Sequence, residues 1–188
     1  ALSATISPRI VADGSIVLDR VHLTKKELQQ INRVYMVACG SAYHTCVVGK
    51  YIMEKLARIP VEADLASEFR YRDPIVDEHT LVIIVSQSGE TADTLAALRE
   101  AKRRGARVLS IVNVVGSTIA SESDDVLYTW AGPEISVATT KAYSTQLTIL
   151  YLLAFYFAHK LGHIDDRDLR RLLSALIRLP DMVAGILR

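Results

Sequence analysis

The sequence predicts an α/β protein, specifically a three-layer α/β/α sandwich around a five-stranded parallel sheet. The chain has 188 residues, of which 50% are hydrophobic and 23% charged, as is typical of a globular chain with one sizeable core. Five short β-rich runs alternate with longer helical patterns, which indicates βαβ units. One run, Leu-Val-Ile-Ile-Val at 81–85, is apolar on both faces, as expected for a parallel strand covered by helices on each side.

The individual elements follow from these patterns. Strands are expected at 34–38, 61–65, 81–85, 108–113 and 126–130. Longer helices are expected at 43–57, 91–104 and about 140–161. Gly105 and Gly162 follow the last two helices and suit the left-handed residue that commonly ends a helix. The charged segment 24–28 predicts a short capped helix.

Three regions are expected along the chain. Residues 1–30 form a lead-in segment and 31–164 the folded domain. Residues 165–188 form a tail helix that continues toward another part of a longer protein, with a kink or break at Pro180 because proline cannot sit in a regular helix interior.

Charge and hydropathy exclude several classes of partner. Twenty-two Lys and Arg residues against 21 Asp and Glu leave a net charge of +1, which gives no reason to expect nucleic acid or an anionic membrane. The longest apolar run, 147–158, is shorter than the roughly 18 residues of a membrane span. Cys39 and Cys46 lack the spacing of metal ligands or of a CxxC motif. The residues that follow Ala1 do not show the pattern of a secretory signal. We therefore expect a cytoplasmic protein with reduced cysteines, and a fragment of a longer chain.

Three loops that follow predicted strands are rich in hydroxyl groups, at 39–43, 86–91 and 136–140. Ligands of open parallel sheets bind beyond the carboxyl ends of the strands, where such loops lie. In the middle loop, Ser86 and Ser88 offer donors and Gly89 permits close approach of the backbone. Thr91 stands where a helix begins and presents unpaired N–H groups. The loop therefore predicts a phosphate monoester site; the alternative is that these hydroxyls merely cap helices.

Other catalytic and cofactor motifs are missing. The chain has no GxxxxGK[ST] or GxGxxG pattern, which removes the usual support for a nucleotide. His44, His79 and His159 show no metal-ligand spacing, so we expect neither a metal nor a cofactor. Glu134 and Lys141 flank the third loop and could act as acid and base, although a structural ion pair explains them equally well.

Four motifs carry a resemblance to a known family. The segment Ser86-Gln87-Ser88-Gly89-Glu90-Thr91-Ala92-Asp93-Thr94 resembles the phosphosugar-binding signature of SIS (sugar isomerase) domains. Segments 39–43, 65–72 and 134–142 are similar to the isomerase half of the glutamine:fructose-6-phosphate amidotransferase family. The likeness runs from about residue 30 to 165 and implies a flavodoxin-like first SIS domain of an aminotransferase that makes glucosamine 6-phosphate for amino-sugar biosynthesis.

The resemblance also implies roles for particular residues. Those expected to hold the phosphate are Ser86, Gln87, Ser88 and Thr91, and those expected to approach the sugar are Ser41, Val137, Ala138 and Thr139. The family's first loop usually reads Cys-Gly-Thr-Ser, so Ala42 departs from it by lacking a hydroxyl. No catalytic residue is expected here, because the family's Schiff-base lysine, ring-opening histidine and enolisation carboxylate lie in the second SIS domain.

Partners follow from the same resemblance. They are a sugar-phosphate substrate, a second SIS domain and a glutaminase domain of the full-length chain, and a second copy in a homodimer. The apolar helix expected at 140–161 supports the homodimer, since it is apolar nearly all round and needs cover.

Two other functions are considered. A free-standing single-SIS phosphosugar isomerase would need its own acid and base near the hydroxyl loops, where Glu90 and Glu134 are available. The sugar-phosphate sensor of a transcription regulator would need a helix-turn-helix, for which residues 1–30 are too short and irregular.

Overall fold

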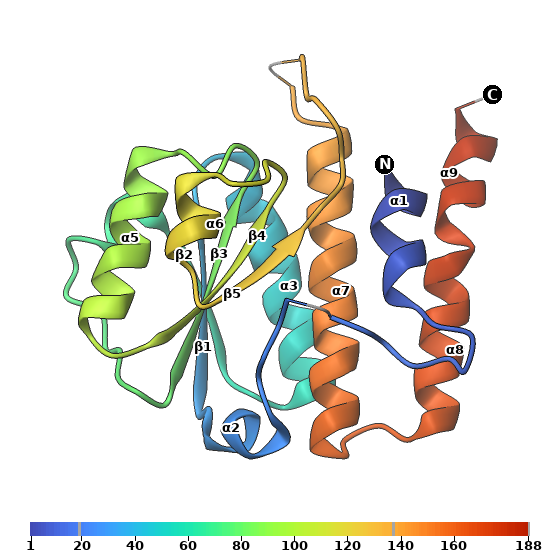
Figure 1. Cartoon of the computed structure of the whole chain (residues 1–188), viewed down its shortest axis with the longest axis horizontal. Helices are drawn as coiled ribbons and strands as arrows, with labels where there is room; N and C mark the ends of the chain where they lie inside the picture. Colours follow the sequence, from blue (N-terminus) through green and yellow to red (C-terminus); the bar gives the residue numbers. More distant parts are fainter. Residues whose placement is uncertain (19, 137, 188) are drawn as a thin grey trace.

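Five parallel strands run through the centre of the molecule, with helices on both faces (Figure 1). The computed structural model describes residues 1–18, 20–136 and 138–187. The strands are β1 (Arg33–Ala38), β2 (Val61–Leu65), β3 (Thr80–Ser86), β4 (Arg107–Val112) and β5 (Asp125–Tyr128). Their order is β2-β1-β3-β4-β5, the flavodoxin-like order, which confirms the predicted sandwich and parallel sheet.

The sheet separates two apolar cores, and alternate side chains of its central strands enter one or the other. Val34 and Met36 of β1 belong to the core under α3 (Ser41–Ala57) and α7 (Lys141–Leu161). Tyr35 of β1 belongs to the core under α4 (Ala66–Phe69), α5 (Ala92–Arg103) and α6 (Thr118–Glu122). Because β3 is covered on both faces, every one of its residues is buried, as the apolar run in the sequence predicts.

Element boundaries differ from the sequence-based expectation at the end of β5. The strand was expected to reach residue 130, but it ends at Tyr128. Trp130 has a φ of 52°, a left-handed conformation that breaks the extended geometry of a strand. The short helix expected near residue 24 is α2 (Lys25–Gln30), which begins with a full capping box between Thr24 and Glu27.

Three helices form an additional layer on the side of α7 away from the sheet (Figure 1). They are α1 (Leu2–Ile6), which continues into the 3-10 turn Ser7–Arg9, then α8 (Asp166–Ile177) and α9 (Leu179–Ile186). Leu169, Leu173 and Leu176 of α8 are buried in the same core as α7. The break predicted at Pro180 is seen as the junction of α8 and α9, with the proline in the first turn of α9.

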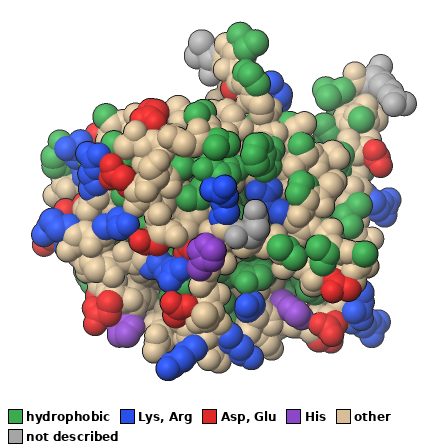
Figure 2. All heavy atoms as spheres, viewed as in Figure 1, with side chains coloured by type: hydrophobic (Ala, Val, Ile, Leu, Met, Phe, Trp, Pro, Cys, Tyr) green, Lys and Arg blue, Asp and Glu red, His purple; other side chains and the backbone are tan. Residues whose placement is uncertain are grey.

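The layer of α1, α8 and α9 explains why α7 is apolar nearly all round. Its side chains pack on α3 and the sheet on one side, and on α1 and α8 on the other. No helix within the described ranges combines the length and apolar content that a membrane span requires. On the face shown in Figure 2, acidic and basic side chains are interspersed.

Candidate functional site

The candidate site lies at the carboxyl ends of β1 and β3. These two strands are neighbours, yet the chain passes from β1 to β2 on one side and from β3 to β4 on the other, which makes this the switch point of the sheet. Ala38 pairs with Val85, so the loops that follow the two strands lie side by side. Between them is a cavity of about 190 Å³, lined by Cys39, Ser41, Ala42, Val85, Ser86, Gln87, Ser88, Thr91, Thr94, Thr139 and Gln146.

The loop after β3 is held by its own hydroxyl groups. The buried Ser86 Oγ accepts a hydrogen bond from the Gly89 N–H at 3.0 Å, and the exposed Ser88 Oγ accepts one from the Glu90 N–H at 3.2 Å. Thr91 is the N-cap residue of α5, but its side chain makes no capping hydrogen bond. Its Oγ1 lies 3.5 Å from Ser86 Oγ instead. Helix capping therefore does not account for the Thr91 hydroxyl, which lines the cavity at the start of α5.

Gly89 fixes the position of this loop against α6. Its φ is +71°, and a Cβ placed on it would lie 2.1 Å from Ser117 Oγ, far closer than atoms can approach. The neighbouring Glu90 accepts a 2.7 Å hydrogen bond from the Thr118 N–H at the start of α6. Hydrogen bonds from Thr118 hold the pKa of Glu90 below its ordinary value. Glu90 is thus an ionised anchor for α6 rather than a free acid or base.

The first and third hydroxyl loops meet at the opposite wall of the cavity. Ser41 Oγ donates to Thr139 Oγ1 at 3.2 Å, which joins residues 98 positions apart in the chain. Ala42 also lines the cavity, so the hydroxyl that it lacks would have faced the site. Ala138 is exposed and is not among the residues that line the cavity. Val137 lies outside the described residues.

Glu134 and Lys141 do not form the ion pair that the sequence suggested. Two backbone N–H groups, from Ala142 at 3.0 Å and Thr140 at 3.3 Å, donate to Glu134 Oε2. These bonds, with that of Ala142 first, hold the pKa of Glu134 below its ordinary value. Lys141 Nζ donates to the Pro133 carbonyl at 2.6 Å. Both side chains are therefore engaged by the backbone around the start of α7, where a carboxylate complements the helix dipole.

Three residues of the inner wall were not among the predicted site residues. Thr94 is 1% exposed, and its Oγ1 donates to Cys39 Sγ at 3.5 Å. Gln146, also 1% exposed, reaches the cavity from α7. The sequence carried one signal for Gln146, a polar residue directly before the apolar run 147–158. Cys46, by contrast, is fully buried away from the cavity lining, and burial raises the pKa of its thiol to about 12.

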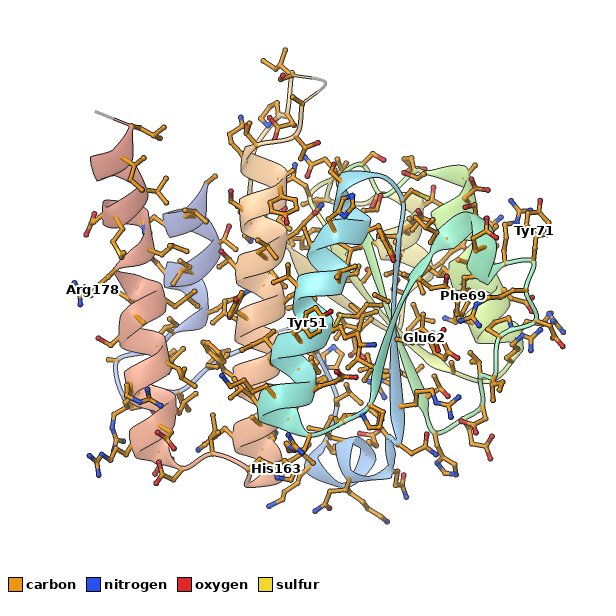
Figure 3. All side chains as sticks on the ribbon, turned by 180° about the vertical axis from the view of Figure 1, so that it is seen from behind. Tyr51, Glu62, Phe69, Tyr71, His163 and Arg178 are labelled. Atoms are coloured by element: carbon orange, nitrogen blue, oxygen red, sulfur yellow. The ribbon has the colours of Figure 1, made fainter. Side chains whose placement is uncertain are left out.

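The segment 67–72 supports the edge of the sheet and the start of α5. Phe69 is buried against Tyr35, whereas Tyr71 projects into solvent (Figure 3). Arg70 forms a 3.0 Å ion pair with Asp93 in the first turn of α5, and Arg72 contacts two carboxylates on β2. Asp93 would add negative charge at the start of α5, and Arg70 offsets it.

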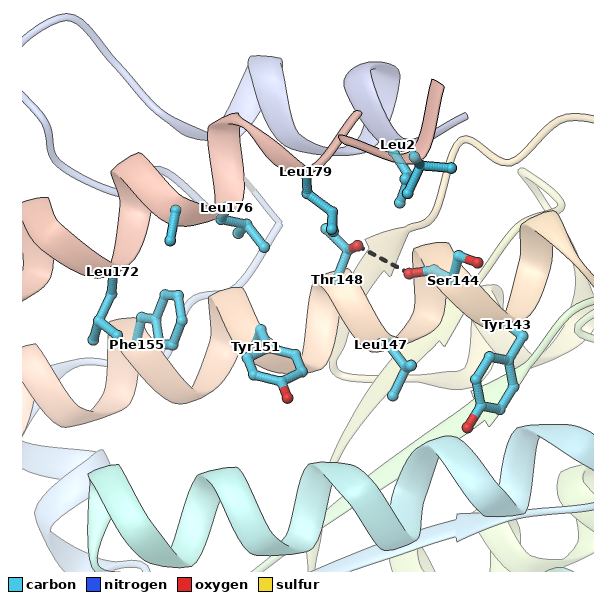
Figure 4. A pocket seen from close by; sticks show the side chains of 12 residues that line it. Leu2, Tyr143, Ser144, Leu147, Thr148, Tyr151, Phe155, Leu172, Leu176 and Leu179 are labelled. Atoms are coloured by element: carbon cyan, nitrogen blue, oxygen red, sulfur yellow. Dashed lines mark hydrogen bonds between the residues drawn. The ribbon is translucent and has the colours of Figure 1, made fainter. Parts of the chain in front are cut away.

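Larger cavities lie elsewhere. An apolar groove of about 520 Å³ runs along α7, lined in part by Leu2, Leu147, Tyr151, Leu176 and Leu179 (Figure 4). Another cavity, of about 490 Å³, lies near the amino ends of the strands, beside Glu27 and Arg107. Within the described ranges, no three His, Cys, Asp or Glu side chains are grouped to hold a metal ion. Volume alone favours the groove as the candidate ligand site, but hydroxyl donors at a sheet switch point favour the smaller cavity.

The fold and this cavity define a doubly wound α/β domain with a polar cavity at the sheet switch point. The chain belongs to the SIS domain family, whose model matches residues 27–156.

Comparison with individual proteins narrows the relationship. The chain is 58% identical to a glutamine–fructose-6-phosphate aminotransferase (isomerizing) from Clostridium tetani, over 94% of this chain and 29% of that protein. It is 57% identical to the protein of the same name from Caldanaerobacter subterraneus, over 100% of this chain and 31% of the relative. A solved C-terminal domain of glucosamine-fructose-6-phosphate aminotransferase from Francisella tularensis matches with a TM-score of 0.93 and 38% identity, over 100% of this chain and 52% of that one. The chain thus spans less than a third of the curated relatives.

Proposed function

We propose that the cavity at the switch point binds the phosphate group of a sugar phosphate. The observation that carries this is the arrangement of Ser86, Ser88 and Thr91 around one small cavity at the N-terminus of α5. Hydroxyl groups and the first N–H groups of a helix are donors suited to the dianion of a phosphate monoester, whose oxygens only accept hydrogen bonds. The side chain of Gln87 lines the same cavity and completes the proposed phosphate set.

The electrostatics of the site support an anion held without a lysine or arginine in the loop. The positive end of the α5 dipole points at the loop, and it acts over the first helical turn. Asp93 lies in that turn, but its carboxylate is paired with Arg70. The Arg70–Asp93 ion pair is partly exposed, so the free energy that it contributes is small and decreases as the salt concentration rises.

The sugar would extend toward the opposite wall. Ser41 and Thr139 present hydroxyls there, and we propose that they approach the sugar together with Val137 and Ala138. We propose fructose 6-phosphate as the sugar phosphate, because both named relatives carry that substrate in their names.

We further propose that the chain is the first SIS domain of a glutamine–fructose-6-phosphate aminotransferase (isomerizing), which makes glucosamine 6-phosphate. High identity to part of two such relatives supports this. No residue here is assigned a catalytic role, since Glu90 and Glu134 are ionised and engaged by backbone groups. The same observation disfavours a free-standing isomerase. A transcription sensor is disfavoured because the relatives that are 57–58% identical to the chain are named as aminotransferases.

The proposed partners are a second SIS domain and a glutaminase domain in the longer protein, and a second copy where this chain is alone. The solved Francisella domain is about twice as long as this chain, which leaves room for a second SIS domain. The apolar groove along α7 is the surface that we propose these partners cover. We also propose a cytoplasmic location, since Cys39 and Cys46 are free thiols.

Binding and turnover can be tested on the chain itself. Calorimetric titration should show weak binding of fructose 6-phosphate and glucosamine 6-phosphate. Incubation with fructose 6-phosphate and ammonia should give no glucosamine 6-phosphate, because the covalent chemistry is proposed to need the second SIS domain. Absence of binding would contradict the proposed site. Measurable glucosamine 6-phosphate would contradict the proposal that catalysis needs the second SIS domain.

A further inference from the structure

The inner wall of the cavity holds an amide group with unmet hydrogen-bonding capacity. Gln146 is 1% exposed, lines the cavity, and its Oε1 is buried with no hydrogen-bond partner among the described residues. Buried polar groups in proteins are almost always paired, because an unpaired one loses its hydrogen bonds to water. A buried acceptor in a ligand cavity therefore indicates a donor that arrives with the ligand.

The residues around Gln146 do not supply that donor. Thr94 is buried beside the same cavity, but its hydroxyl donates to Cys39 Sγ. Val85 and Ala42 contribute apolar side chains to the lining. The cavity thus has an outer part rich in hydroxyl donors at 86–91, where Gln87 Oε1 is also a buried acceptor without a partner among the described residues, and an inner part where Gln146 Oε1 is the unused acceptor.

A phosphate group fits one part and not the other. Its ionised oxygens accept hydrogen bonds, so it complements the Ser86, Ser88 and Thr91 loop. The dianionic phosphate group of a sugar phosphate has no proton to offer Gln146 Oε1, and inorganic phosphate, which keeps a P–OH group near neutral pH, is expected to bind at the outer donors. A sugar hydroxyl does offer a proton, and it can also accept from the amide Nε2 of the same residue.

We propose that Gln146 determines specificity by accepting a hydrogen bond from a hydroxyl of the bound sugar, so that the cavity prefers a polyhydroxylated phosphate ester to phosphate alone. This rests on the proposed function, which places the phosphate at the outer part. A neutral amide suits the position, since a carboxylate there would repel the bound phosphate.

The experiment compares two ligands on four proteins by calorimetry. Inorganic phosphate and fructose 6-phosphate are titrated into the wild-type chain, Gln146→Met, Ser88→Ala and Ser144→Ala. Methionine keeps a similar volume without the amide, and Ser144 lies on the groove side of the same helix as a control. Gln146→Met should weaken fructose 6-phosphate about tenfold, the effect of one hydrogen bond, and leave inorganic phosphate unchanged. Ser88→Ala should weaken both ligands, and Ser144→Ala neither.

Several outcomes would overturn the proposal. Equal weakening of both ligands by Gln146→Met would mean that the residue only shapes the cavity, and no change with either would mean that its amide does not meet the sugar. The wild-type chain gives a test without any variant, since it should bind fructose 6-phosphate more tightly than inorganic phosphate. Equal affinities there would overturn the role of Gln146 while the phosphate site stands. Binding of neither ligand would overturn the proposed function and this inference together.

Discussion

Two concave regions of this molecule, the groove along α7 and the cavity at the strand ends, differ in volume and in the chemistry of their linings. The groove along α7 has about 520 Å³ and an apolar lining, whereas the cavity at the strand ends has about 190 Å³ and is lined by hydroxyl and amide groups. Leu2, Leu176 and Leu179 point toward α7 across the groove (Figure 4). Apolar surface of this kind suits another protein surface, while convergent donors at a helix N-terminus suit an anion. Chemistry and place in the fold, rather than volume, separate the two.

The largest expected effect concerns the layer that forms one side of the groove. Leu173→Ala in α8 should lower the free energy of unfolding by about 2–5 kcal/mol, since the side chain is 2% exposed and its removal leaves a cavity. Urea unfolding followed by circular dichroism measures this. Leu187→Ala, at a position 80% exposed, is the control and should change little. An equally small loss for Leu173→Ala would mean that α8 is not part of the core.

A change at Gly89 should affect the polar cavity and the stability together. Gly89→Ala places a Cβ against Ser117 at a positive φ, so we expect a cost of about 1–3 kcal/mol from the backbone conformation, increased by the clash. Phosphate-ester binding should be lost because the loop must move. Gly116→Ala is a matched control, with a φ of +76° and open space around its Cβ. Thermal unfolding and titration of both variants would separate the clash from the conformational cost. Equal losses of stability and of binding in the two variants would mean that the contact between Gly89 and Ser117 has no special role.

Ser88→Ala isolates the ligand chemistry from the fold. The side chain is exposed and bonds only to the neighbouring Glu90 N–H among the described residues, so stability should barely change. Binding of a sugar phosphate should weaken by about 1–3 kcal/mol, the range for a hydrogen bond to a charged group. Calorimetric titration of variant and wild type provides the measurement. Unchanged affinity would mean that Ser88 only stabilises the loop.

The smallest change in stability is expected for a substitution in the groove itself. Its effect should appear in the molar mass of the assembly in solution. Sedimentation equilibrium at micromolar concentration should show that the chain forms at least a dimer. Leu147→Glu should shift it toward the 20.8 kDa monomer, because it places a charge on the apolar groove surface that we propose is covered. A monomeric wild type would show that α1, α8 and α9 cover α7 sufficiently.

Local patterns were enough to predict most of the fold. The five strands were located within two residues at their ends, because short β-rich runs that alternate with helical patterns are a local signal. The hydroxyl loops were placed at strand ends for the same reason, and Ser41, Ser86, Gln87, Ser88, Thr91 and Thr139 do line one cavity. Their role toward a ligand stays a prediction.

The parts that only the tertiary structure decided depend on contacts between distant residues. Ser41 meets Thr139 and Gln146 reaches the cavity because α7 packs beside α3, whereas the strand order alone would leave the end of β5 three places away from β1. Glu134 could not be recognised as a helix anchor, since its partners are backbone groups that exist only once α7 forms. The spacing of apolar residues in α8 predicted a helix, but it did not predict that this helix packs against α7. Sequence periodicity determines which face of an element is apolar, whereas packing across the whole chain determines what that face meets.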